Sequence, residues 1–182
     1  MNILFLTSTL PRFAGDSQAP FVLEQAQAWK NARPDDTIII LAPGDSDASR
    51  NETWNGIAVN RFTYFYPRHF QKLAYPAILP NIKRNPLLIF QIPFFLFSQF
   101  WVARRLCKKY NITLVYAHWV MPQGITAYLL HGLLRIPYIL QNHSSDLSIF
   151  RKIPIFGKSM ARAIINKATR LFCVNCILKD EA

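Results

Sequence analysis

The sequence predicts an α/β fold in which helices cover both faces of a doubly wound (Rossmann-like) parallel sheet. Short apolar, β-branched runs recur along the 182 residues, and segments with helical periodicity separate them. The runs are almost continuously apolar, as expected of parallel strands that are buried on both faces. No linker or low-complexity tract divides the chain, so residues 1–182 are predicted to form a single domain.

The first half of the chain contains three of the predicted strands. NILFLT at 2–7 and TIIILAP at 37–43 are continuous apolar runs, and GIAVNRF at 56–62 alternates as an edge strand does. Between the first two, residues 20–32 place Phe, Val, Ala and Trp side chains at helical spacing. The Pro-Gly pair at 43–44 ends the second strand in a turn.

A long helical pattern opens the second half of the chain. It begins at Asn85-Pro86, because proline is preorganised for the first helical position, and the helical pattern then continues to Lys109. Strand-like and helical patterns then alternate again, which predicts strands at 112–117, 136–141 and 169–174 and helices at 123–135 and 151–167.

Several function classes are excluded by motifs that the chain lacks. Its six glycines are scattered, so it has neither the G-x-G-x-x-G turn of dinucleotide-binding folds nor a P-loop. HSSD at 143–146 contains the side chains of a hydrolase triad, but adjacency does not make its geometry, and the G-x-S-x-G elbow is missing. Dehydrogenases, P-loop enzymes and serine hydrolases are therefore excluded.

The three cysteines favour a reducing compartment and predict no metal site. Their odd number does not suit a disulfide framework. Cys173 and Cys176 form a single C-x-x-C pair, whereas structural zinc needs four ligands. We interpret them as ordinary cysteines beside a strand end.

Two predicted strands end in histidines. NITLVYA is followed by His118 and Trp119 before a P-x-G turn, and IPYILQN is followed by His143. In parallel α/β sheets, ligands bind at the carboxyl ends of the strands. The sequence therefore predicts a ligand site to which both strand ends contribute, with Asp146 in the second segment.

The loop after the first strand is the third candidate segment. Residues 7–21 hold Arg12, Gly15 and Asp16 just before the first helix. Glycine lets the backbone approach a ligand, and a helix N-terminus favours a phosphate group. Taken singly, a loop glycine is commonly a turn and His118 commonly a structural histidine. The expected convergence of three segments on one rim of the sheet favours a ligand site.

Charge is distributed unevenly along this chain of net charge +11. Residues 1–52 have four Lys or Arg against seven Asp or Glu, whereas residues 53–145 have ten Lys or Arg and no acidic residue. The same region contains the aromatic stretches TYFYPRHFQKLAYP at 63–76 and IFQIPFFLFSQFWVARR at 89–105. Such a surface suits an anionic membrane, a lipid phosphate or nucleic acid. The alternative is a solvated basic face over a Phe-rich core.

The apolar run at 87–103 leaves three interpretations open. A spanning helix needs about 20 residues, which places this run at the short end. An interfacial helix lying among lipid headgroups fits Trp101 and the basic pairs on either side. The third interpretation is a core helix packed on the sheet. Pro93 is expected to kink the helix in each case.

Taken in order, the three rim segments resemble the N-terminal half of a GT-B glycosyltransferase of the large retaining family 4. The family's opening pattern, P-R-F, G-D and P-F-V, matches LPRFAGDSQAPFV at 10–22. Its H-W then P-x-G matches AHWVMPQG at 117–124, and its H-G-S-D matches HSSD at 143–146, with Ser144 in place of the glycine. The resemblance extends over the whole chain, and it implies the acceptor-binding half of a sugar-transferring enzyme.

The resemblance also implies roles for the residues at the rim. The loop with Arg12, Gly15 and Asp16 would approach the donor phosphate and the acceptor. His118 with Trp119 would shape the acceptor pocket.

His143 is the catalytic residue that the resemblance implies. It would face the transferring sugar as a hydrogen-bonding group near the anomeric centre, and Asp146 would orient its loop or contact a hydroxyl. No metal or other cofactor is expected, because basic residues and a helix N-terminus of the other half stabilise the leaving diphosphate in this family.

The family's donor-binding domain, with its basic pair and its two glutamates, has no counterpart within residues 1–182. We therefore expect sugar transfer to require that domain, in cis or in trans, and we expect these residues alone to be inactive. The alternative is a non-catalytic or split-enzyme subunit that associates with membranes and needs a separate donor-binding partner.

The partners follow from the resemblance and from the basic aromatic region. They are a nucleotide-sugar donor, a lipid-linked or saccharide acceptor in cell-surface glycan synthesis, and an anionic membrane contacted by residues 63–105. The expected location is cytoplasmic, peripheral to the inner face of the membrane. No nucleic-acid partner is expected, since the chain has no RNP, helix-turn-helix or zinc signature.

Overall fold

The computed structural model describes residues 1–182 except 14, 17–18, 47, 144–156 and 175–182. The described residues form a seven-stranded sheet in the order β3-β4-β2-β1-β5-β6-β7. The strands are β1 (Asn2–Leu6), β2 (Thr37–Pro43), β3 (Asn51–Trp54), β4 (Ile57–Phe62), β5 (Leu114–His118), β6 (Tyr138–Asn142) and β7 (Arg170–Cys173). Neighbours are parallel except β3 with β4. The predicted Rossmann-like sheet is confirmed.

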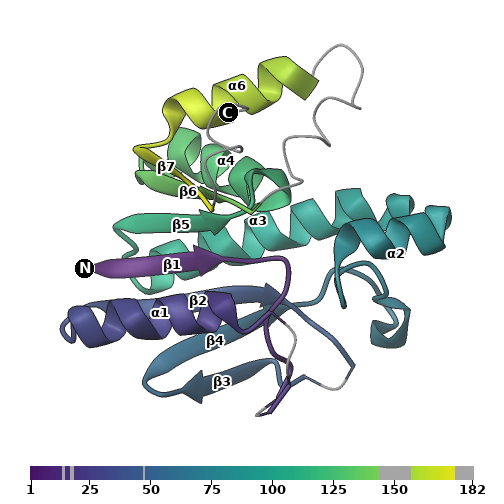
Figure 1. Cartoon of the computed structure of the whole chain (residues 1–182), viewed down its shortest axis with the longest axis horizontal. Helices are drawn as coiled ribbons and strands as arrows, with labels where there is room; N and C mark the ends of the chain where they lie inside the picture. Colours follow the sequence, from purple (N-terminus) through teal and green to yellow (C-terminus); the bar gives the residue numbers. More distant parts are fainter. Residues whose placement is uncertain (14, 17–18, 47, 144–156, 175–182) are drawn as a thin grey trace.

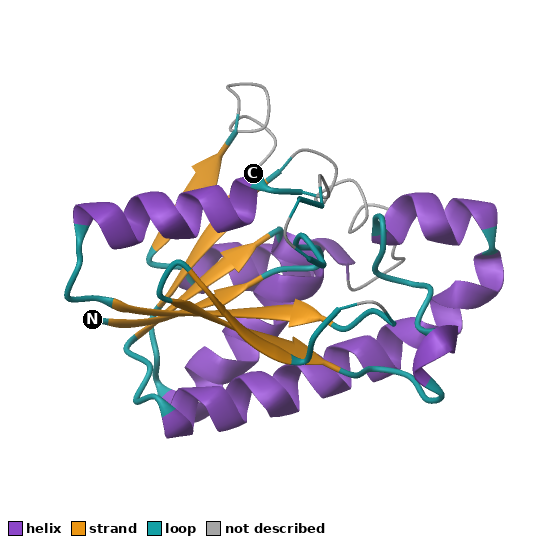
Figure 2. Cartoon of the chain, turned by 90° about the horizontal axis from the view of Figure 1, so that it is seen from below, coloured by secondary structure: helices purple, strands orange, loops and turns teal. Residues whose placement is uncertain are grey.

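Helices cover both faces of the sheet (Figures 1 and 2). One face is covered by α1 (Phe21–Ala32), and the other by α3 (Ile92–Lys109), α4 (Ile125–Leu134) and α6 (Gly157–Lys167). Between β4 and α3 the chain forms the turn η1 (Arg68–Phe70), the short helix α2 (Ile78–Arg84) and the turn η2 (Pro86–Gln91). A wide turn, η3 (Val120–Gly124), joins β5 to α4.

Strand side chains alternate between two apolar cores. Leu4 and Leu6 of β1 belong to the core under α3, whereas Ile3 and Phe5 belong to the core under α1. All four are fully buried. A strand buried on both faces needs an apolar residue at every position, so the central strands are continuous apolar runs in the sequence.

The strand predicted at 56–62 lies one place inside the edge of the sheet, so the edge assignment was wrong. An additional strand, β3, pairs antiparallel with β4 and occupies the edge. Between them, Asn55 and Gly56 have φ of 51° and 79°, the left-handed values that a two-residue hairpin turn requires. An Asn-Gly pair is a strong hairpin signal, and the strand prediction did not use it.

The long helix predicted from Pro86 to Lys109 is confirmed, with a change of geometry inside it. The Asn85 side chain accepts the backbone N–H of Leu87 and caps a 3₁₀ turn, and α-helical geometry begins only at Ile92. Pro93 therefore lies in the first turn of α3, where its missing N–H costs no helical bond.

The helix predicted at 151–167 is described from Gly157 onward, as α6. Residues 151–156 lie outside the described residues.

Gly124 marks a close contact between the start of α4, strand β6 and α6. A Cβ atom at this position would lie 3.1 Å from Cγ2 of Ile164 and 3.2 Å from Cδ2 of Leu140, both of which are fully buried. We expect Gly124→Ala to lower the free energy of unfolding by about 1–3 kcal/mol, because branched core side chains must shift. Urea unfolding measures this change.

Gly132→Ala is the matched control. Gly132 lies inside α4 and a Cβ there would meet nothing within 4 Å. Alanine is a better helix former than glycine by about 1 kcal/mol, so this variant should be at least as stable as the wild type. Equal effects of the two substitutions would contradict the close packing at Gly124.

Candidate functional site

The carboxyl ends of β1, β5 and β6 meet at one edge of the sheet. β5 lies between the other two strands, and the register pairs Leu6 with Ala117 and His118 with Gln141. The residues that follow these strands therefore emerge side by side, as the parallel topology requires. Figure 1 shows all three strands pointing toward the same end of the sheet.

His118 and His143 contact each other at this edge. Nδ1 of His118 lies 3.1 Å from Nε2 of His143, and the rings stack with their centroids 5.3 Å apart. The predicted convergence of the two strand ends is confirmed. However, His118 is fully buried and only His143 is partly exposed. His118 therefore lies behind His143 and does not itself line a pocket, so its effect on a ligand passes through His143.

Both imidazoles are neutral near pH 7. Burial lowers the pKa of His118 to about 3, and the neighbouring His143 contributes a smaller part. Burial also lowers the pKa of His143 to about 4. A hydrogen bond between two neutral imidazoles needs one N–H donor and one bare acceptor nitrogen.

The burial of His118 indicates which ring nitrogen of each histidine carries the proton. Nε2 of His118 is buried and has no hydrogen-bond partner in the described part of the chain. A buried N–H without an acceptor is rarer than an unpaired acceptor, so we place the His118 proton on Nδ1. His143 then accepts at Nε2 and has its own proton on Nδ1. The pair therefore presents a neutral N–H donor at the edge of the sheet.

Aromatic rings surround His143. Its ring centroid lies 4.7 Å from that of Trp119 and 4.9 Å from that of Phe21, which is the first residue of α1. Phe21 and Trp119 are 5.8 Å apart and both are accessible to solvent. The segment after β1 thus reaches the site through Phe21, which was not among the predicted site residues. Flat apolar rings beside a hydrogen-bond donor suit a sugar, whose ring has apolar faces and a polar rim.

Trp119 adopts a backbone conformation that is uncommon for a residue with a Cβ atom. Its φ is 74° and its ψ is 136°, a region that costs on the order of 1–3 kcal/mol. Two backbone hydrogen bonds hold it: its N–H donates to Gln141 O at 2.8 Å, and its carbonyl accepts the N–H of Gly124 at 3.1 Å. This turn places the indole beside His143 directly after the strand ends.

A chain of hydrogen bonds supports the histidines from below. Nε2 of Gln25 in α1 donates to Oη of Tyr116 at 2.7 Å, and the Tyr116 hydroxyl donates to Oε1 of Gln141 at 2.6 Å. The Tyr116 ring stacks on His118 with centroids 5.0 Å apart. These hydrogen bonds connect α1, β5 and β6, so the base of the site is built from three elements.

The loop after β1 is shaped by a charged pair. Oδ2 of Asp16 accepts the backbone N–H of Arg12 at 2.9 Å and its Nε at 2.8 Å. Gly15 has a φ of 89°, which favours glycine. The Asp16 carboxylate is largely buried in this contact, so it serves to close the loop. That Arg12, Gly15 and Asp16 approach a donor phosphate or an acceptor stays a prediction.

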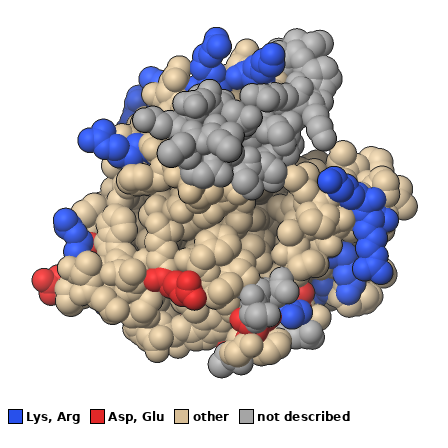
Figure 3. All heavy atoms as spheres, viewed as in Figure 1, with Lys and Arg blue, Asp and Glu red and all other residues tan. Residues whose placement is uncertain are grey.

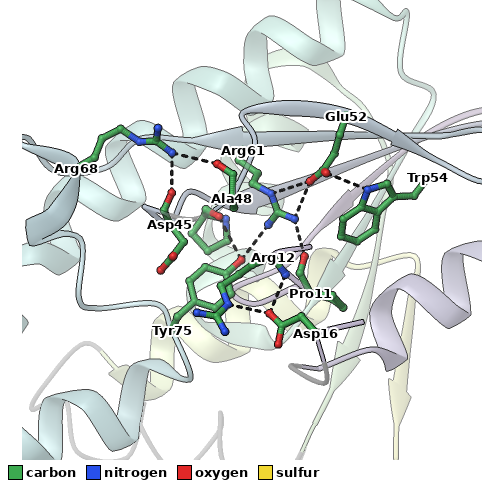
Figure 4. A network of polar contacts seen from close by, with 11 residues as sticks. Pro11, Arg12, Asp16, Asp45, Ala48, Glu52, Trp54, Arg61, Arg68 and Tyr75 are labelled. Atoms are coloured by element: carbon green, nitrogen blue, oxygen red, sulfur yellow. Dashed lines mark hydrogen bonds and ion pairs between the residues drawn. The ribbon is translucent and has the colours of Figure 1, made fainter. Parts of the chain in front are cut away.

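The buried guanidinium of Arg61 in β4 connects this loop to β3 and to the segment before α2 (Figure 4). It donates to Pro11 O at 2.6 Å, to Tyr75 Oη at 3.1 Å and to the Glu52 carboxylate at 3.0 Å. Its side chain has no exposed area. The sequence contains one signal of this role that the prediction did not use: Arg61 is a charged residue inside a buried strand.

The described residues contain no group of three or more His, Cys, Asp or Glu side chains that could hold a metal ion. Cys107 is a buried free thiol. Asp146, the remaining predicted site residue, lies outside the described residues, as does Cys176.

The fold is that of a Rossmann-like domain with a candidate site at the carboxyl edge of its sheet, and comparison with known proteins identifies its family. A family model described as Glycosyltransferase Family 4 matches residues 20–181. The chain belongs to that family. An uncharacterized glycosyltransferase of Methanocaldococcus jannaschii is 25% identical over 120 residues, which make up 62% of this chain and 34% of that protein. The match therefore spans about a third of this curated relative.

A solved structure has the same fold. Sucrose-phosphate synthase of Thermosynechococcus elongatus superposes with a TM-score of 0.61 at 13% sequence identity. The match covers 98% of this chain and 79% of that structure. At this level of identity the likeness concerns the fold, and it agrees with the N-terminal half of a GT-B glycosyltransferase.

The two neutral histidines make the folding stability depend on pH. Their pKa values of about 3 and 4 in the folded state lie below the ordinary 6.5, so the unfolded chain binds protons first as the pH falls. Their contribution to stability is present above pH 6.5 and is lost as the pH falls toward 4. Between pH 7 and 5, we expect the protonation of each histidine in the unfolded chain to lower the free energy of unfolding by on the order of 2 kcal/mol.

Urea unfolding across this pH range checks the prediction. The double variant His118→Gln/His143→Gln should depend less steeply on pH than the wild type. His69→Gln is the control and should behave as the wild type, because His69 is exposed. An equally steep dependence in the double variant would show that other groups are responsible.

Arg61→Met tests the network of Figure 4. The substitution removes the donor of the Pro11 carbonyl and of Glu52 Oε1, while Trp54 Nε1 still donates to Glu52 Oε2, so the free energy of unfolding should fall by about 3 kcal/mol. Arg50→Met is the control, because Arg50 is exposed, and it should change stability by less than about 0.5 kcal/mol. If urea unfolding gave equal stabilities for the two variants, the network would not be needed for the fold.

Proposed function

We propose that this chain is the acceptor-binding half of a glycosyltransferase that moves a hexosyl group from a nucleotide-sugar to a lipid-linked or saccharide acceptor. One observation supports the proposal most directly. In a family 4 domain, a neutral and partly exposed His143 lies beside both Trp119 and Phe21 at the carboxyl edge of the sheet. A hydrogen-bond donor beside flat apolar rings is suited to holding a sugar.

In this proposal His143 donates a hydrogen bond from Nδ1 to the transferring sugar near its anomeric centre. Positive charge builds on the anomeric carbon as its bond to the diphosphate breaks. A neutral imidazole can orient the sugar without the repulsion that an imidazolium would add, so the lowered pKa of His143 suits this role. His118 is a positioning residue, because its bond to Nε2 keeps the His143 proton on Nδ1.

The nucleotide-sugar requires a donor-binding domain, supplied in cis or in trans. Basic residues and a helix N-terminus of that domain would stabilise the leaving diphosphate without a metal ion. Arg12 and Gly15, in the loop after β1, would approach the donor phosphate from this side. Residues 1–182 would then bind the acceptor and would not catalyse transfer alone.

The acceptor is proposed to be met at the cytoplasmic face of a membrane, in the synthesis of cell-surface polysaccharide. A peripheral location would give access both to soluble nucleotide-sugars and to lipid-linked acceptors. The basic aromatic region between residues 63 and 105 supports this part of the proposal.

Replacement of His143 tests the proposed function. In a protein that joins these residues to a donor-binding domain, His143→Ala should lower kcat about 100-fold, because one positioned hydrogen-bond donor is lost in the transition state. Transfer from UDP-linked and GDP-linked hexoses to a soluble saccharide is the measurement, and circular dichroism checks the fold. His69→Ala is the control and should retain the wild-type rate.

An unchanged rate for His143→Ala would remove His143 from the site. Turnover of a nucleotide-sugar by residues 1–182 alone would contradict the need for a donor-binding domain. If the joined protein transferred no hexose from either nucleotide, a non-catalytic or split-enzyme subunit would replace the proposed function.

A further inference from the structure

Helix α3 has two apolar faces, and the rest of the described protein covers one of them. The covered face packs on the sheet through Phe95, Gln99, Ala103, Leu106 and Cys107. A second line of large side chains, Phe90, Phe94, Phe97 and Trp101, continues from η2 along the helix at spacings of three or four residues. These four side chains are exposed, with Phe90 at 70% and Phe97 at 65%.

Within the described ranges, Pro86–Lys109 is the one stretch long and apolar enough to cross a membrane. Only 28% of its most apolar window is buried in the protein, so it is not an ordinary core helix. Its covered face nevertheless packs on the sheet, and a spanning orientation would take β1 and β2 into the bilayer with it. Of the three interpretations of residues 87–103, this packing favours an interfacial helix with one face in the core.

Basic residues follow the exposed line of aromatic side chains along the same side of the helix. Arg105 and Lys108 follow Trp101 at the same helical spacing, and the Arg104 guanidinium lies 5.3 Å from the centroid of the Trp101 ring. Lys83 and Arg84 lie before the other end of the helix, in α2, and Figure 3 shows Lys and Arg side chains gathered over α2. No acidic residue occurs between residues 53 and 145, so no carboxylate of this region opposes the charge.

We propose that the α3 strip (Phe90, Phe94, Phe97, Trp101, Arg105 and Lys108) is the surface by which this domain docks on an anionic lipid bilayer. The helix lies in the plane of the headgroups, with the phenylalanine rings among the acyl chains and the tryptophan at the headgroup level. Arg105, Lys108 and the basic residues of α2 contact lipid phosphates. This inference deepens the proposed function, on which it rests for the claim that a lipid-linked acceptor is met at this surface.

A bilayer fits the strip better than a protein partner does. Protein interfaces are depleted in lysine, and charged side chains are scarce at their centres. Here the apolar rings form a narrow line with basic groups at both ends, the arrangement of helices that lie in an anionic membrane interface. Docking requires no rearrangement of the core, because the rings concerned are already exposed.

Vesicle flotation of the 182-residue chain tests the surface. The wild type should float with vesicles that contain phosphatidylglycerol, and it should float weakly with phosphatidylcholine alone or at high salt. Phe94→Glu/Phe97→Glu should weaken binding by at least about tenfold, because two large apolar side chains no longer enter the bilayer. Arg105→Gln/Lys108→Gln should weaken it by about fivefold for each charge removed.

The matched control places the same charges on another helix. Leu129 and Leu133 of α4 are 45% and 55% exposed, so Leu129→Glu/Leu133→Glu tests whether any exposed apolar pair suffices. This variant should lose only the part of the binding due to net charge, and thermal unfolding checks that every variant is folded.

Three results would overturn the inference. The first is failure of the folded wild type to float at low salt. The second is an equal loss of binding in the α3 and α4 double variants. The third is self-association in solution that Phe94→Glu/Phe97→Glu abolishes while vesicle binding is absent, which would make the strip a contact between protein chains. Flotation is measured without a sugar donor and transfer with a soluble acceptor, so failure of the docking surface and failure of the proposed function are separate outcomes.

Discussion

The pairing of β5 between β1 and β6 is the constraint on which the candidate site depends. Its register sets Ala117 beside Leu6 and His118 beside Gln141. Because strand side chains alternate between faces, a slip of one residue would turn His118 away from His143 and from the Phe5 ring of β1 that stacks on it. Apolar residues on both faces of the central strands resist such a slip, so the position of two polar rings is fixed by an apolar sheet.

Much of the fold could be predicted because its central strands are buried on both faces. Burial of this kind leaves a continuous apolar run, and the helices between the runs then dictate parallel pairing. The antiparallel hairpin at the edge follows a different rule, the turn chemistry of Asn55 and Gly56, and was missed for that reason. The apolar pattern of α3 could not show which face is covered, because large side chains lie on both of its faces.

The location of the site could be predicted from the sequence more readily than the arrangement of its side chains. Topology brings the ends of β5 and β6 together, and the histidines at both ends were visible in the sequence. The depth of His118 depends on what stacks on it, including Phe5 and Tyr116, and on the turn at Trp119. The contact with Phe5, and the bond from Trp119 to Gln141 that holds the turn, join distant segments, and neither periodicity nor spacing reveals them. The same holds for Arg61, whose partners come from three parts of the chain.

The position of β1 in the middle of the sheet has a consequence for how the chain reaches its fold. β1 is made before the other six strands of the described sheet, and β2 follows closely. The β5 side of β1 waits for residues far downstream: the backbone N–H of Asn2 bonds to Oγ1 of Thr113, 111 positions later. Closing so long a loop is slow, because its entropy is lost before the contacts form. During synthesis, one edge of an apolar strand therefore stays unpaired until residues 114–118 have emerged, and an unpaired apolar edge is prone to aggregate.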